Sequence, residues 1–109
     1  MITFQSGEVI LAAIPFIGGG GAKRRPLLVL IDTGDSDIIV APISSRAAQA
    51  HYEVALQEWQ IAGLVGPSVA RVHKVTVVEK QLVTRRLGKL TTKDWARVRT
   101  RVKRLWANI

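Results

Sequence analysis

The chain of 109 residues contains no cysteine and only one methionine. Without cysteine it can form neither a disulfide framework nor a thiolate metal site. Its two histidines, His51 and His73, lack the spacing of metal ligands and stand apart from any carboxylate cluster, so the sequence predicts no metal site and no cofactor. The absence of cysteine suits a reducing compartment, and we expect a cytoplasmic protein.

Long apolar runs are also missing. No run approaches the roughly 18 residues that a membrane-spanning helix needs, so we expect no membrane span. A secretory leader is not expected either, because residues 1–7 carry no basic residue and Glu8 precedes the apolar part. Hydrophobic residues nevertheless make up 48% of the chain, enough to build the core of one domain covering residues 1–109.

Acidic residues are scarce in the second part of the chain. Residues 1–67 contain four basic and six acidic side chains, whereas residues 68–109 contain twelve basic and two acidic ones. The net charge of the whole chain is +8. This asymmetry indicates a polyanionic partner, either nucleic acid or an acidic protein. A solvated basic helix at the C-terminus is the alternative interpretation.

Five short segments have the β-branched and apolar content of strands, and turn residues separate them. Pro42, near the end of the third segment, suits a strand at a sheet edge or a strand end. The glycines in residues 18–24 predict a mobile loop between the first two segments. Short consecutive strands favour a small, strongly bent antiparallel sheet or barrel. The predicted strands are residues 7–15, 25–32, 37–45, 51–56 and 68–80.

One amphipathic helix is predicted over residues 91–106, which makes the fold mainly β with a C-terminal helix. Thr91 is placed to cap the helix, and Asp94 three positions later forms an imperfect capping box. An apolar stripe recurs with helical spacing and predicts the side that packs on the sheet. The members of the stripe are Trp95, Val98, Val102 and Leu105.

The glycines Gly18–Gly21 suggest a phosphate-binding loop, but the residues after them do not fit one. A Walker loop needs Gly-Lys-Ser/Thr at the start of a helix, whereas here Lys23 follows an alanine and a strand follows the loop. No serine lies in a nucleophile elbow. The sequence therefore predicts neither a nucleotide-binding loop nor a serine hydrolase.

What remains is a set of arginines with a few hydroxyl and imidazole groups, which suits metal-free cleavage of RNA. RNA supplies its own nucleophile, the 2′-hydroxyl. Cleavage then needs a base for the hydroxyl proton, an acid for the leaving 5′-oxygen and positive donors for the phosphorane. Arginine suits the last task best, because its guanidinium presents a fixed fork of donors to phosphate.

Several motifs, read in order, resemble the MazF/PemK family of bacterial toxins. Gly7-Glu8-Val9 opens the first strand, Arg25-Pro26 begins the second, and Pro42-Ile43-Ser44-Ser45 ends the third. Further along, Ser68-Val69-Ala70-Arg71 resembles the family's Ser-Val-x-Arg strand, and Leu87-Gly88-Lys89-Leu90 resembles its lead-in to a C-terminal helix. The resemblance covers nearly the whole chain and is weakest between residues 46 and 65.

The resemblance implies an SH3-like antiparallel barrel with a C-terminal helix, working as a homodimer. It also implies the toxin component of a type II toxin–antitoxin system. Such toxins inhibit growth as metal-independent, sequence-specific endoribonucleases. They cut single-stranded RNA such as mRNA by attack of the 2′-hydroxyl and leave a cyclic phosphate. A cognate acidic antitoxin is expected to hold the protein inactive by lying over the RNA groove.

Four candidate catalytic residues follow from the resemblance. Arg25 matches the family's catalytic arginine before proline and would stabilise charge on the phosphorane. Ser44 stands where the family has a catalytic threonine, and it keeps the hydroxyl but lacks the methyl group. Arg71 matches an arginine that some members use, and His73 takes the place of their proposed aspartate base. Residues two apart on a strand face the same side, so Arg71 and His73 should project together.

Polar neighbours of these residues are predicted to bind RNA, namely Lys23, Arg24, Ser45 and Arg46. Simpler structural roles stay open for all four catalytic candidates: Arg71 can be a solvated residue on the strand face, and His73 can be a packed histidine. Arg25 can form a surface ion pair with Asp32 or Glu8, and Ser44 can cap the turn after its strand.

Two other functions also stay open. One is a non-catalytic nucleic-acid-binding module on the same barrel, and the other is a degenerate toxin that keeps only antitoxin binding. The presence of Ser44 and His73 in place of threonine and aspartate favours the degenerate toxin. The retained Arg25-Pro26 pair and the hydroxyl of Ser44 argue against it.

Overall fold

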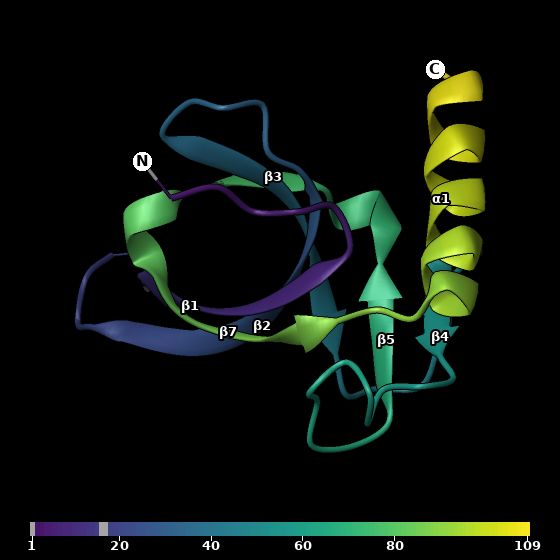
Figure 1. Cartoon of the computed structure of the whole chain (residues 1–109), viewed down its shortest axis with the longest axis horizontal. Coiled ribbons are helices and arrows are strands. Elements are labelled where there is room, and N and C mark those ends of the chain that lie inside the picture. Colours follow the sequence, from purple (N-terminus) through teal and green to yellow (C-terminus); the bar gives the residue numbers. More distant parts are fainter. Residues whose placement is uncertain (1, 16–17) are drawn as a thin grey trace.

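The structure is a computed structural model that describes residues 2–15 and 18–109. Its described part forms one antiparallel sheet, two short 3-10 helices and one α-helix (Figure 1). The elements in chain order are β1 (Glu8–Pro15), β2 (Ala22–Ile31), β3 (Asp37–Ser44), β4 (Glu53–Leu56), β5 (Ser68–Arg71), η1 (Val72–Lys74), β6 (Thr76–Glu79), η2 (Lys80–Leu82), β7 (Val83–Lys89) and α1 (Thr92–Ala107).

The sheet curls strongly on itself. Its strands follow the order β4-β5-β3-β2-β1-β7, and β6 pairs with the first half of β3. Figure 1 shows β1, β2 and β7 sweeping around a common interior, while α1 stands beside β4 and β5. The predicted fold class, mainly antiparallel β with a C-terminal helix, is confirmed. In the described residues the path of paired strands ends at β4 and β7, so backbone hydrogen bonds leave the barrel open between these two strands.

β3 is an interior strand, so the suggestion of a sheet edge from Pro42 is wrong. β3 pairs with β2 on one side, and on the other side first with β6 and then with β5. Pro42 lies between the residues that pair with β6 and those that pair with β5. Proline has no backbone N–H group to donate to a neighbouring strand, and no such hydrogen bond is needed between the part of β3 that pairs with β6 and the part that pairs with β5.

Two apolar clusters lie on the two faces of the curled sheet. Neighbouring residues of one strand alternate between them: Val9 and Leu28 belong to the cluster under α1, and Ile10 and Val29 to the cluster inside the curl. This alternation follows from the two-residue period of a strand. Full burial of each such side chain contributes about 1.5–3 kcal/mol to folding. Apolar residues at consecutive positions, whose side chains point to opposite faces, therefore explain why the sheet is covered on both faces.

The strand predictions differ from the structure in three places. Residues 68–80 form two strands separated by η1, because Val72 turns into the core and its N–H bonds to the carbonyl of Tyr52 at 3.1 Å. β7 was not predicted at all, since its charged residues and a glycine hide any alternation. β2 already begins at Ala22, opposite Pro15, so the second half of the predicted loop at residues 18–24 is strand.

α1 begins and packs as predicted. The Oγ1 atom of Thr91 accepts the N–H of Asp94 at 3.3 Å, and the whole apolar stripe packs on the cluster under the helix. The carboxylate of Asp94, however, does not bond to Thr91. It accepts the N–H groups of Gln57 and Glu58, at 3.1 and 2.9 Å, and so ties the helix to the chain that follows β4.

The segment after β4 also contacts β7 through two glycines. A Cβ atom on Gly88 would overlap the carbonyl of Ala62, and one on Gly63 would overlap the carbonyl of Leu87. Gly63 in addition has a φ of +83°, which favours glycine. The two backbones therefore lie closer than any side chain would allow.

Among the described helices, none combines the length and apolar character needed to cross a membrane.

Candidate RNA-binding groove

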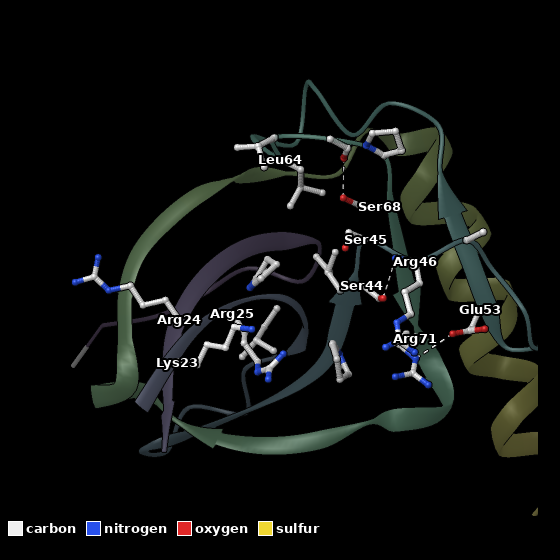
Figure 2. Close-up of a pocket in the computed structure, with 18 of the residues that line it drawn as sticks. Lys23, Arg24, Arg25, Ser44, Ser45, Arg46, Glu53, Leu64, Ser68 and Arg71 are labelled. Atoms are coloured by element: carbon white, nitrogen blue, oxygen red, sulfur yellow. Dashed lines mark hydrogen bonds and ion pairs between the residues drawn. The ribbon is translucent and has the colours of Figure 1, made fainter. Parts of the chain in front are cut away.

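A groove of about 700 Å³ lies between the start of β2, the end of β3, β5 and the segment before β5 (Figure 2). Basic residues line it from several elements, and among the described lining residues Glu53 is the one carboxylate. The apolar part of its wall includes Pro26, Leu27, Leu64 and Val65. The basic lining residues are Lys23, Arg24, Arg25, Arg46 and Arg71.

The first three cations come from the exposed start of β2. Arg25 lies opposite Ala12 of β1, and Pro26 follows it in the same ladder. Because side chains alternate along a strand, Lys23 and Arg25 share one face and Arg24 takes the other. Figure 2 shows Arg24 extending away from Arg25, on the outer side of the groove. Arg25 is thus the arginine of β2 that faces the remaining groove residues.

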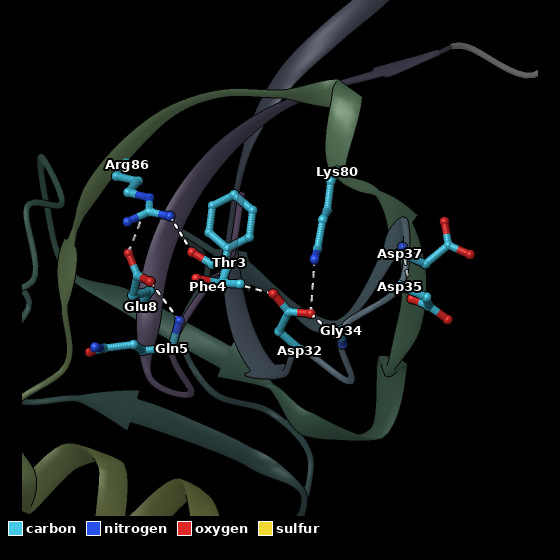
Figure 3. A network of polar contacts seen from close by, with 10 residues as sticks. All are labelled: Thr3, Phe4, Gln5, Glu8, Asp32, Gly34, Asp35, Asp37, Lys80 and Arg86. Carbon is cyan, nitrogen blue, oxygen red and sulfur yellow. Dashed lines mark hydrogen bonds and ion pairs between the residues drawn. The ribbon is translucent and has the colours of Figure 1, made fainter. Parts of the chain in front are cut away.

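The ion pairs suggested as a structural role for Arg25 are wrong. Asp32 pairs with the Nζ atom of Lys80 at 3.0 Å, and Glu8 pairs with the Nε atom of Arg86 at 3.6 Å. Figure 3 shows both carboxylates engaged in this separate network. Backbone N–H groups of Phe4 and Gly34 lower the pKa of Asp32 below its usual value, and Lys80 adds to the effect. Neither of these two partners suggested for Arg25 engages it.

Ser44 ends β3 at the floor of the groove. Its Oγ atom accepts the backbone N–H of Arg46 at 3.1 Å, so it does cap the turn after the strand. This bond uses a lone pair and leaves the hydroxyl proton available to a ligand. The turn also brings Ser45 and Arg46 to the groove wall, where both are exposed.

Arg71 ends β5 and is held by Glu53 of the neighbouring strand. The two residues are directly opposite in the ladder, and Arg71 Nε lies 2.9 Å from Glu53 Oε2. Glu53 Oε1 accepts the N–H groups of Gln49 and Ala50 at 2.8 and 2.7 Å. The backbone N–H groups of Gln49 and Ala50 and the Arg71 guanidinium lower the pKa of Glu53 below its usual value. The Nη groups of Arg71 make no hydrogen bond to the described residues and stay available for an anion.

His73 does not join the groove, so the prediction that it projects beside Arg71 is wrong. β5 ends at Arg71, and His73 lies in η1, where the two-residue alternation of a strand no longer applies. It is absent from the described residues that line the groove. Its Nδ1 atom is buried and, within residues 2–15 and 18–109, has no hydrogen-bond partner.

The groove thus joins the other seven predicted site residues. The sequence missed Glu53, because its partner Arg71 is distant in sequence and no motif marks the pair. It also missed the wall at residues 64–68, whose glycine and proline indicated only a turn. The arrangement offers several guanidinium and ammonium donors and a hydroxyl. The one carboxylate among the described lining residues, Glu53, is ion-paired with Arg71. It can bind a chain of phosphates and stabilise added charge on one of them.

Solved structures of similar fold include proteins named as endoribonucleases and as toxins. An endoribonuclease from a mycobacterial species has a TM-score of 0.77 at 14% identity, covering 98% of this chain and 94% of that chain. Toxin MazF-mt6 of Mycobacterium tuberculosis has a TM-score of 0.70 at 19% identity, covering 90% and 96%. A MazE–MazF structure from Deinococcus radiodurans has a TM-score of 0.72 at 24% identity, covering 98% of both chains. At these identities the likeness shows a shared fold.

The family is shown by a match to the sequence itself. No curated protein matches the chain closely enough to count as a relative. A family model for the PemK-like, MazF-like toxin of type II toxin-antitoxin systems, however, matches residues 5–106, nearly the whole chain. The chain therefore belongs to the PemK-like, MazF-like family of type II toxin–antitoxin toxins.

Proposed function

We propose that the protein is a metal-independent, sequence-specific endoribonuclease that cuts single-stranded RNA such as mRNA in this groove. The observation that carries the proposal is the meeting of Arg25, Ser44 and Arg71 in one cationic groove, although they come from three strands. Names of structural neighbours include endoribonucleases, which supports the same activity.

The reaction proceeds by attack of the RNA 2′-oxygen on the adjacent phosphorus, and the proton of the 2′-hydroxyl passes to solvent water. The bond to the 5′-oxygen breaks and this oxygen takes up a proton from water, which leaves a 2′,3′-cyclic phosphate and a 5′-hydroxyl end. Arg25 and Arg71 donate hydrogen bonds to the phosphorane oxygens, where negative charge increases in the transition state. The hydroxyl group of Ser44 donates a hydrogen bond to the same phosphate. His73 lies outside the groove and has no role in the proposed reaction.

The other polar residues of the groove hold the strand on either side of the cut. Lys23, Arg24 and Arg46 attract flanking phosphates, and Ser45 adds a hydrogen bond at the turn. Phosphate contacts of this kind fix the register of the strand but do not select its bases. Sequence preference then comes from the walls of the groove.

The partners follow from the family and from charge. We propose that a cognate acidic antitoxin covers the same groove and that the protein acts in the cytoplasm as a homodimer. Structural neighbours include toxins solved with their antitoxins, and the net charge of +8 suits an acidic partner. A row of apolar side chains on adjacent strands, Ile31, Ile39 and Val77, supports a second copy, because Ile31 and Val77 are exposed.

The test is cleavage of a mixed-sequence RNA in EDTA by the purified protein, with the product ends identified. Arg25→Ala and Ser44→Ala should each lose cleavage while the circular dichroism spectrum and melting temperature stay unchanged. Arg99→Ala removes the same charge from the outer side of α1 and serves as the matched control.

Two results would contradict the proposal. Tight RNA binding without cleavage of any sequence would indicate a non-catalytic binding module. Protein that neither binds nor cuts RNA but still binds an acidic antitoxin would indicate a degenerate toxin.

A further inference from the structure

α1 carries a row of basic side chains on the side that faces β4. Lys93, Arg97 and Arg101 follow at four-residue intervals and Arg104 comes three residues later, spacings that put side chains on one side of a helix. Arg97 Nη1 donates to the carbonyl of Ala55 in β4 at 2.6 Å, so this side of the helix lies against that strand. We call these four residues the basic row.

The basic row adjoins the groove, because only β4 and the turn before it lie between them. Glu53, two residues from Ala55 in β4, holds Arg71 in the groove. Arg104 Nη1, at the other end of the row, lies 3.3 Å from Nε2 of His51 in the turn. Figure 2 shows Arg71, Glu53 and the helix in succession away from Arg25. Residues 51–55 therefore have the groove on one side and the basic row on the other.

Carboxylates do little to balance the charge of the row. In the part of the chain that the structure describes, its one ion pair joins Arg97 to the buried Asp94 at 3.2 Å. Lys93 and Arg101 form no ion pair with the described residues. Like charges four residues apart repel and destabilise a helix. An anionic partner would relieve this repulsion.

We propose that the basic row binds the phosphates of RNA that leaves the groove past Arg71. The proposal rests on the proposed cleavage of RNA in the groove and names a second contact with the same strand. RNA longer than the groove must continue over a neighbouring surface, and the row is a cationic surface that starts one strand away. Because phosphate contacts carry no sequence information, the row should add affinity for long RNA without changing the sequence that is cut.

The test compares two double variants of the full chain. Lys93→Gln/Arg101→Gln removes two charges from the basic row. Arg99→Gln/Lys103→Gln removes two charges from the opposite flank of the same helix and is the matched control. Glutamine is a good helix former, so both variants should fold. The probe is single-stranded RNA with 2′-O-methyl groups throughout, which cannot be cut, in lengths of about 6 and about 24 nucleotides, the shorter comparable to one single-strand binding site.

Each lost phosphate contact should weaken binding of the long RNA about fivefold at about 0.1 M salt. The row variant loses two such contacts, so we expect it to bind the long RNA about 25-fold more weakly. The slope of log K against log salt should become shallower by about 1.4. The control variant should bind the long RNA as the wild type does, and the short RNA should bind equally to all three proteins.

Three results would overturn the proposal: equal losses in both variants, an equal loss for the short RNA, or unchanged RNA binding with lost binding of an acidic antitoxin. Cleavage of unmodified RNA by the wild type is measured in parallel. If the wild type does not cut this RNA, the proposed function is contradicted. Binding of the uncleavable probes tests the basic row independently of cleavage.

Discussion

Glu53 and Arg71 face each other across β4 and β5, and the carboxylate of Glu53 holds the guanidinium by its Nε atom at 2.9 Å. Three donors converge on this carboxylate, since Gln49 and Ala50 bond to its other oxygen. Its side chain is 8% exposed. With both oxygens engaged, Glu53 orients Arg71 and leaves the two Nη groups of the arginine for the phosphate.

Glu53→Gln should therefore impair RNA cleavage about as much as Glu53→Ala. An amide has one acceptor oxygen, so its NH2 group must face either Arg71 or the backbone donors. Misplacement of a catalytic group by about 1 Å can cost about 100-fold in rate, and we expect a loss of about 10- to 100-fold. The measurement is kcat on a short RNA, with Gln49→Ala as the control because Gln49 contributes only its backbone N–H. Full activity of Glu53→Gln would contradict the orienting role.

His73→Ala should leave cleavage unchanged, contrary to the role as a base that the sequence suggested. His73 lies in η1, outside the described lining of the groove. A histidine that acted as the base would give a rate change near pH 6–7 that disappears in the variant. The measurement is the pH dependence of kcat/KM for both proteins. A flattened profile in His73→Ala would restore His73 to the mechanism.

Acid should destabilise the fold partly through Asp32. Its pKa is lowered in the folded state, first by the backbone N–H groups of Phe4 and Gly34 and then by Lys80. A carboxyl with a lowered folded pKa contributes stability above its ordinary value of 3.8, and this contribution is lost as the pH falls through the folded pKa. Asp32→Asn should therefore be less stable than the wild type at neutral pH, with the difference shrinking below about pH 4.

Urea unfolding at a series of pH values measures this effect. Asp37→Asn is the control, because the carboxylate of Asp37 forms no ion pair with the described residues. A constant difference between Asp32→Asn and the wild type down to pH about 2 would show that Asp32 has no lowered pKa.

Gly88→Ala should destabilise the protein by about 1–3 kcal/mol or more, as overpacking of a tight contact does. The new methyl group would overlap the carbonyl of Ala62, which is backbone and can move only with its whole segment. Gly66→Ala is the control, because a Cβ atom there meets nothing within 4 Å. Chemical denaturation compares the two variants. Equal stabilities of the two variants would mean that the segment before β5 moves aside at no cost, which would contradict the tight contact between Gly88 and Ala62.

Asp94→Ala should lower the free energy of unfolding by about 2–4 kcal/mol, because the partly buried N–H groups of Gln57 and Glu58 lose their charged acceptor. Asp94 is 1% exposed, so its carboxylate makes these bonds away from bulk water. Thr91→Ala removes only the helix cap and should cost about 1 kcal/mol. Thermal and urea unfolding give both values. A smaller loss for Asp94→Ala than for Thr91→Ala would contradict the tie between α1 and the chain after β4.

Local patterns predicted most of the elements. Short apolar runs marked β1 to β3, the alternation of residues 51–56 marked β4, and the stripe from Trp95 to Leu105 marked the packed side of α1. β7 was missed because its pairing with β1 is a long-range contact that its own residues do not reveal. The split of residues 68–80 was missed for a related reason: Val72 is drawn into the core by neighbours from other strands.

The sequence by itself determined the charge asymmetry, the continuous apolar runs that cover both faces of the sheet, and the motifs by which the family is recognised. These are properties of neighbouring residues, so they can be read in order along the chain. Only the tertiary structure decided that Arg25, Ser44 and Arg71 share one groove, that Glu53 orients Arg71, and that His73 stays outside. Those relationships depend on strand register and on where each strand ends, and both are set by packing between segments far apart in the chain.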